Sequence, residues 1–126
     1  MPTVAQISHF EPARMDRDRL LKLFADHGQP GAERLIGRTL EDLAVRLNRV
    51  ERSWKDGDQV RLCHGARELS EVAMHIGLVS LAKAALAASR AATAGDHAAM
   101  GATVARMMRL GEASLMSVWD LRDLSV

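Results

Sequence analysis

Apolar side chains recur along most of this chain at intervals of three and four residues, the spacing of one face of an α-helix. The first run follows Asp16, a good N-cap residue, and predicts a short helix from about Arg17 to Asp26. Residues 27–31, which include two glycines and a proline, separate it from a long amphipathic helix ending near residues 55–57. The apolar face of that second helix consists of Leu35, Leu40, Leu43, Leu47, Val50 and Trp54.

Three more helices follow. Asp58 caps the next one, and Gly77 ends it or marks a tight crossing. Gly95 closes an alanine-rich fourth helix, and Asp96 caps the last. The apolar arc of the third helix consists of Leu62, Ala66, Leu69, Ala73 and Ile76. The last helix contains methionines that suit core filling, namely Met100, Met107, Met108 and Met116. No stretch alternates like a strand, so we expect an all-α fold: an antiparallel up-down four-helix bundle preceded by a short N-terminal helix.

The composition agrees with packed helices. Hydrophobic residues make up 48% of the 126 residues, yet there are only 2 Trp, 2 Phe and no Tyr. A chain of this length buries a sizeable core as one domain without disulfides or metal ions. Residues 1–14 show no sustained period and contain Pro2 and Pro12, so we predict an N-terminal arm there and one helical domain over residues 15–126.

Charge, cysteine content and hydropathy indicate which kinds of partner and which compartment the sequence favours. Lys and Arg number 17 against 16 Asp and Glu, a net charge of +1, which disfavours nucleic acid as a partner. The single cysteine, Cys63, lies in an apolar helical pattern and is expected to be a buried structural thiol in a reducing compartment. Lys83 and Arg90 interrupt the most apolar stretch, residues 76–94, so no membrane span is expected. The first residues lack the pattern of a signal peptide, and a cytoplasmic location is expected.

Motifs for most enzyme chemistries are absent from the sequence. There is no phosphate-binding loop, GxGxxG, GxSxG or HExxH, and Glu71 and His75 are four residues apart rather than the three of a di-iron motif. We therefore expect neither a metal site nor a cofactor. The sequence leaves the oligomeric state open.

The run from Gly57 to Glu71, GDQVRLCHGARELSE, resembles the segment that contains the active histidine in histidine-containing phosphotransfer (HPt) domains. Residues that fall at the family's spacing in one ungapped register are Asp58, Leu62, Ala66, Leu69, Gly77, Leu81 and Ala82, and the resemblance extends over roughly residues 15 to 120. It implies a cytoplasmic, bacterial-type phosphorelay protein whose partners are a response-regulator receiver domain, a sensor histidine kinase, or both.

The same register changes all three signature positions. Arg67 stands at the active histidine, Ser70 at the lysine that favours the incoming phosphoryl charge, and Glu71 at the glycine that lets the partner approach. A guanidinium stays protonated and delocalised, so it cannot act as the nucleophile. The resemblance therefore implies a pseudo-phosphotransfer domain, which binds its partner through His64, Arg67, Glu68, Ser70, Glu71 and His75.

Three alternatives remain. His64 lies one turn before Arg67 and about 60° around the helix, on the predicted solvent stripe, and is the candidate for a displaced phosphoryl acceptor; His75 lies two turns beyond Arg67. The second alternative is a non-signalling helical interaction module, since one fold hosts many functions. The third is a small-molecule enzyme. Signalling predicts His64 and Arg67 exposed on a flat face, whereas an enzyme predicts a deep pocket with convergent polar groups.

Overall fold

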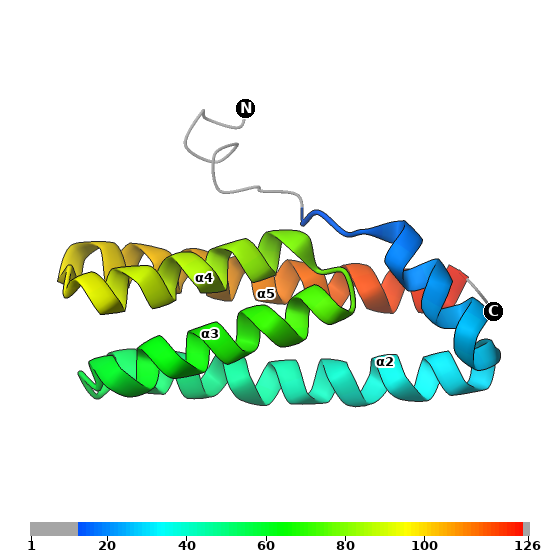
Figure 1. Cartoon of the computed structure of the whole chain (residues 1–126), viewed down its shortest axis with the longest axis horizontal. Coiled ribbons are helices and arrows are strands. Elements are labelled where there is room, and N and C mark those ends of the chain that lie inside the picture. The colour runs from blue at the N-terminus through cyan, green and yellow to red at the C-terminus, as the bar shows by residue number, and fades with distance from the viewer. Residues whose placement is uncertain (1–12, 125–126) are drawn as a thin grey trace, which may run out of the picture.

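The computed structural model describes residues 13–124, without the side chains of Trp119 and of residues 121–124. Within that range the chain forms four helices and no strand: α2 (Arg17–Lys55), α3 (Gln59–His75), α4 (Val79–Ala94) and α5 (His97–Leu124). The all-α prediction is confirmed. The α2–α3 and α4–α5 connections lie at one end of the molecule and the α3–α4 connection lies toward the other (Figure 1). Each helix packs against two others, in the order α2, α3, α4, α5 and back to α2.

Three aspartates begin helices as predicted. The carboxylates of Asp16, Asp58 and Asp96 each accept a hydrogen bond from the backbone N–H three residues on, at 3.2, 3.0 and 3.1 Å respectively. Each bond satisfies one of the N–H groups that lack a partner within the helix. Gly77 and Gly95 follow α3 and α4 with φ of +77° and +68°, the left-handed conformation in which helices commonly end.

The break predicted at residues 27–31 is present inside α2. Gly28 has non-helical torsions, φ 70° and ψ 167°, and two helical segments meet there at a kink. Glycine adopts a positive φ without a steric penalty, and Pro30 lies in the turn after it, where its missing N–H matters least. The direction of α2 changes in this region, so its first turns lie at an angle to the rest of the helix (Figure 1).

Buried apolar side chains from all four helices form a single core. All five residues of the predicted α3 arc are buried in it, and α4 contributes mainly alanines. Leu35 and Met116 were predicted to be buried, and this is wrong: Leu35 is 37% exposed and Met116 is 62% exposed. Leu35 lies shortly after the break in α2 and lines a depression beside the end of α3, so no helix covers it completely. Periodicity alone cannot detect this. The Trp119 side chain and residues 1–12 of the predicted arm, which covers residues 1–14, lie outside the described residues.

Two glycines of α5 allow a close approach of α2. A Cβ atom on Gly111 would lie 2.7 Å from Leu47 Cδ1, and one on Gly101 would lie 3.1 Å from Trp54 Cζ2. Large side chains of α2 therefore occupy the space left by missing side chains on α5. This packing accounts for two glycines inside a long helix, where they lower helix propensity.

Candidate functional site

One face of α3 is open to solvent along its length. Val60, His64, Arg67, Glu71 and His75, which we call the α3 stripe, are all exposed. They were predicted to face solvent because they lie opposite the apolar arc at about 100° per residue. The stripe places a histidine and an arginine one turn apart, with a carboxylate one turn further on.

Ser70 does not belong to this exposed face. It is half-buried, and its Oγ donates a hydrogen bond to the carbonyl oxygen of Ala82 on α4 at 2.8 Å. Ser70 and His64 lie three residues on either side of Arg67, so they are rotated by about 60° in opposite senses around the helix. The Ser70 hydroxyl therefore links α3 to α4, and its contact with a partner stays a prediction.

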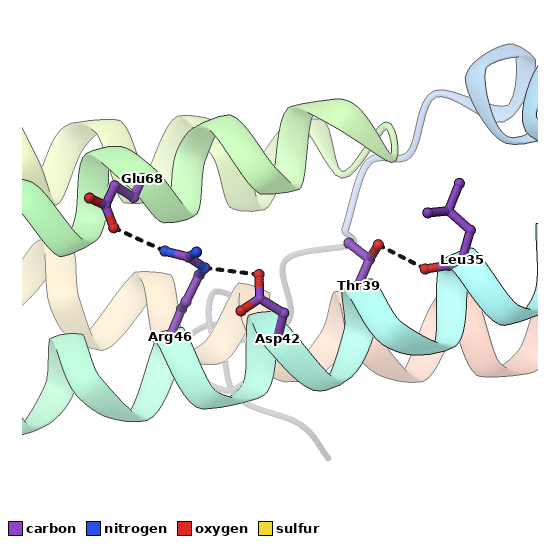
Figure 2. A network of polar contacts seen from close by, with 5 residues as sticks. All are labelled: Leu35, Thr39, Asp42, Arg46 and Glu68. Carbon is purple, nitrogen blue, oxygen red and sulfur yellow. Dashed lines mark hydrogen bonds and ion pairs between the residues drawn. The ribbon is translucent and has the colours of Figure 1, made fainter.

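Glu68 lies on the other edge of the stripe and binds α2. Its carboxylate lies 3.0 Å from Arg46 Nη1, and Arg46 Nε lies 2.9 Å from Asp42 (Figure 2). The hydrogen bond to Asp42, followed by the smaller effect of Glu68, raises the pKa of Arg46, while burial acts in the opposite direction. All three side chains are partly exposed, so this network orients α3 against α2 more than it stabilises the fold.

Cys63 lies on the edge of α3 that faces α4. The thiol is half-buried rather than buried as predicted, and its Sγ is 3.4 Å from Ser89 Oγ and 3.2 Å from Thr93 Oγ1. The hydrogen bond with Ser89 and then that with Thr93 lower the pKa of this thiol, and the positive charge of Arg67 acts in the same direction. Burial opposes these effects. The cation at the centre of the stripe thus has an electrostatic effect on the edge beside α4.

Two depressions lie along the seam between α2 and α3. The first, about 450 Å³, is at the kinked end of α2 and is lined by Arg19, Lys22, Leu23, Leu35, Val72 and His75 among others; we call it the kink groove. The second, about 380 Å³, is at the other end and is lined by Arg49, Arg52, Arg61 and Gly65 among others. Neither of these two depressions is lined by His64 or Arg67, whose side chains are exposed on the α3 stripe.

The predicted site residues are therefore brought together in part. His64, Arg67, Glu71 and His75 share the exposed face, Glu68 lies beside them in an ion pair, and Ser70 faces α4. Among the described side chains no group of three His, Cys, Asp or Glu residues could hold a metal ion, and no helix of residues 13–124 is long and apolar enough to cross a membrane.

The kink groove was not predicted. Its signal in the sequence is the glycine and proline of residues 27–31 together with Leu35, an apolar residue directly after that break. The periodicity assigned Leu35 to the core, because it cannot show which helix covers a given position.

No protein-family model, curated protein or solved structure matches this chain.

Proposed function

We propose that this chain is a phosphorelay protein of the HPt type that has lost its nucleophile and acts by binding a receiver domain or a sensor histidine kinase. With it we propose the corresponding architecture, an antiparallel up-down bundle preceded by a short N-terminal helix, and a cytoplasmic location. The observation that carries the proposal is the exposure of His64 and Arg67 on an open face of α3. An enzyme with its site inside the bundle would instead need convergent polar groups in a deep pocket.

The chemistry of Arg67 favours binding over transfer. A guanidinium is always protonated, so it offers no nucleophile for a phosphoryl group. It does offer a fork of N–H donors that matches carboxylates, and a receiver domain concentrates carboxylates in the pocket that it presents to a phosphotransfer partner. Arg67 at the centre of the α3 stripe would bind that pocket where the family's histidine would react.

A charge-reversal experiment tests this proposal. Purified receiver domains are titrated with the wild type, with Arg67→Glu and with Arg90→Glu, a matched change at an exposed arginine of α4. We expect Arg67→Glu to weaken binding by at least about tenfold, since a charge pair at an interface becomes a like-charge contact, and Arg90→Glu to have little effect. Equal binding by the wild type and Arg67→Glu would remove the proposal.

The second candidate function is phosphotransfer through His64. What favours it is that the His64 imidazole is exposed and lies one turn from a cation that could balance phosphoryl charge. The test is incubation with phosphorylated receivers, followed by measurement of acid-labile phosphate on the wild type, on His64→Ala and on His75→Ala. Transfer that is lost only in His64→Ala supports this function. Transfer that persists in His64→Ala excludes His64, and binding without any transfer supports the pseudo-domain.

A receiver panel that neither binds nor phosphorylates the chain would leave the non-signalling interaction module. The same α3 stripe would then bind another protein. The test would be whether the immobilised wild-type protein captures a partner that immobilised Arg67→Glu does not.

A further inference from the structure

The break in α2 creates the kink groove. Before Gly28 the helix contributes Arg19, Lys22 and Leu23 to one wall, and after it the helix contributes Leu35 to another. The end of α3 closes the groove. The resulting depression of about 450 Å³ is partly open to solvent. A small molecule is usually enclosed by its site, whereas an open trough suits a segment that continues beyond it.

The floor of the groove is apolar. Leu23, Leu35, Val72 and Ile76 line it, and the Leu35 side chain is 37% exposed. The hydroxyl of Thr39 adds little polarity, since its Oγ1 donates to the Leu35 carbonyl oxygen at 2.8 Å (Figure 2). An incoming apolar side chain would therefore remove apolar surface from water without leaving that hydroxyl unpaired.

The rim of the groove is mainly cationic. Arg19 and Lys22 are exposed on it, one turn apart, and His75 lies on the opposite side; Asp26 is the carboxylate among the lining residues. The Arg19 Nε donates to the His75 carbonyl oxygen at 3.1 Å, which holds the guanidinium at the mouth of the groove. No ion pair within the described residues engages Lys22. The rim is therefore complementary to an anionic ligand.

We propose that the kink groove binds a short acidic segment of a partner protein, which places a bulky apolar side chain on the Leu23–Leu35–Val72 floor and carboxylates against Arg19 and Lys22. The apolar floor supplies affinity, and the cations set the orientation and the rate of encounter. This site does not depend on phosphotransfer or on Arg67. It shares only His75 with the α3 stripe.

The rim is tested with a matched pair of charge reversals. The probe is a short fluorescein-labelled peptide that alternates leucine with aspartate, and binding is followed by fluorescence anisotropy. We expect saturable binding to the wild type, a loss of about fivefold in affinity for Lys22→Glu, and no change for Lys83→Glu, which reverses an exposed charge on α4. Lys22→Met, which keeps the aliphatic stem, provides a second variant if the reversal disturbs folding. Absence of saturable binding, or equal loss for both reversals, would overturn the proposal.

The floor is tested with a second pair. Leu35→Ser should weaken binding by about tenfold, whereas Val45→Ser, at another exposed apolar residue of α2, should leave it unchanged. A control peptide with serine in place of leucine should bind no variant well. If sedimentation instead shows a wild-type dimer that Leu35→Ser dissociates, the groove is covered by a second copy and the proposal is wrong. Receiver binding by Arg67→Glu reports separately on the proposed function.

Discussion

Gly77 is the residue at which the N-terminal segment meets the connection between α3 and α4. Its φ is +77°, and a Cβ atom added there would lie 2.8 Å from the carbonyl oxygen of Asp16 and 3.2 Å from Arg19 Cβ. The Asp16 N–H also donates to the Gly77 carbonyl oxygen at 2.7 Å. Glycine is thus required twice, for its torsion and for the close contact.

Replacing Gly77 should therefore cost more than strain in the backbone alone. We expect Gly77→Ala to lower the free energy of unfolding by about 2–4 kcal/mol, measured by urea denaturation, since left-handed torsion and steric overlap both oppose the methyl group. Gly57→Ala is the control, because Gly57 has a φ of +71° but no atom within 4 Å of an added Cβ. Its cost should be about 1–2 kcal/mol. Equal losses in the two variants would contradict the close contact.

Two buried serines should respond in opposite ways to alanine. Ser114 Oγ is buried without a hydrogen-bond partner among the described residues, so Ser114→Ala should leave stability unchanged or raise it by about 1 kcal/mol. Ser89 Oγ donates to the Cys63 carbonyl oxygen at 2.9 Å, so Ser89→Ala should destabilise by about 1–2 kcal/mol. The free energy of unfolding of both variants is measured by urea denaturation. A large decrease in this free energy for Ser114→Ala would show that the Ser114 hydroxyl has a hydrogen-bond partner.

The lowered pKa of Cys63 predicts a pH dependence of its reactivity. The thiolate is the reactive form, so alkylation of the folded protein should reach half its maximal rate at a lower pH than alkylation of the urea-unfolded chain. Thr93→Val removes one of the two hydroxyls and should move that midpoint upward. Thr103→Val, a matched change on α5, should leave that midpoint unchanged. Coincident midpoints in the folded and unfolded chains would contradict the effect of the hydroxyls.

At the scale of the element, the contact between α2 and α5 depends on size matching between a leucine and a glycine. Gly111→Ala should destabilise by about 1–3 kcal/mol, since the new methyl group would overlap Leu47 Cδ1 and Cδ2, at 2.7 and 2.9 Å. Leu47→Ala alone should cost about 2–5 kcal/mol through the cavity that it leaves. In that background Gly111→Ala should cost less or become favourable. Additive losses in the double variant, measured by denaturation, would show that the two residues do not share one space.

The local features of the helices could be predicted from the sequence, and the contacts between helices could not. Asp16, Asp58 and Asp96 cap their helices through atoms only three residues away, so the sequence contains all the information that the prediction needs. The apolar arc of α3 follows from its period. The exposed half of the candidate site, including His64 and Arg67, follows by the same reasoning.

The predictions fail for residues whose burial or side-chain contacts depend on a neighbouring helix. Cys63 was predicted to be buried from its place on α3, but its contacts depend on how α4 lies beside it. Leu35 matches the apolar period of α2, yet no helix covers it completely.

For the whole molecule, a core shared by all four helices predicts one cooperative transition. Buried residues of α2, α3, α4 and α5 belong to a single cluster, so no helix should lose its packing before the others. In Trp119→Phe, Trp54 is the remaining tryptophan and reports on the contact between α2 and α5. Its fluorescence and the helical circular dichroism signal should change at the same urea concentration. A separation of the two curves would show that α5 leaves the bundle independently.

The contacts of the N-terminal segment also determine how the molecule would bear mechanical load. Arg14 N–H donates to Ser80 Oγ at 2.7 Å, the Ser80 N–H donates back to the Arg14 carbonyl oxygen at 3.3 Å, and the Asp16 N–H holds Gly77. Tension applied to the chain ahead of Arg14 would reach these few hydrogen bonds before it reached the body of α2. The hydrogen bonds that join Arg14 and Asp16 to Ser80 and Gly77 would therefore break first. The long helices would bear the tension only after those bonds had broken.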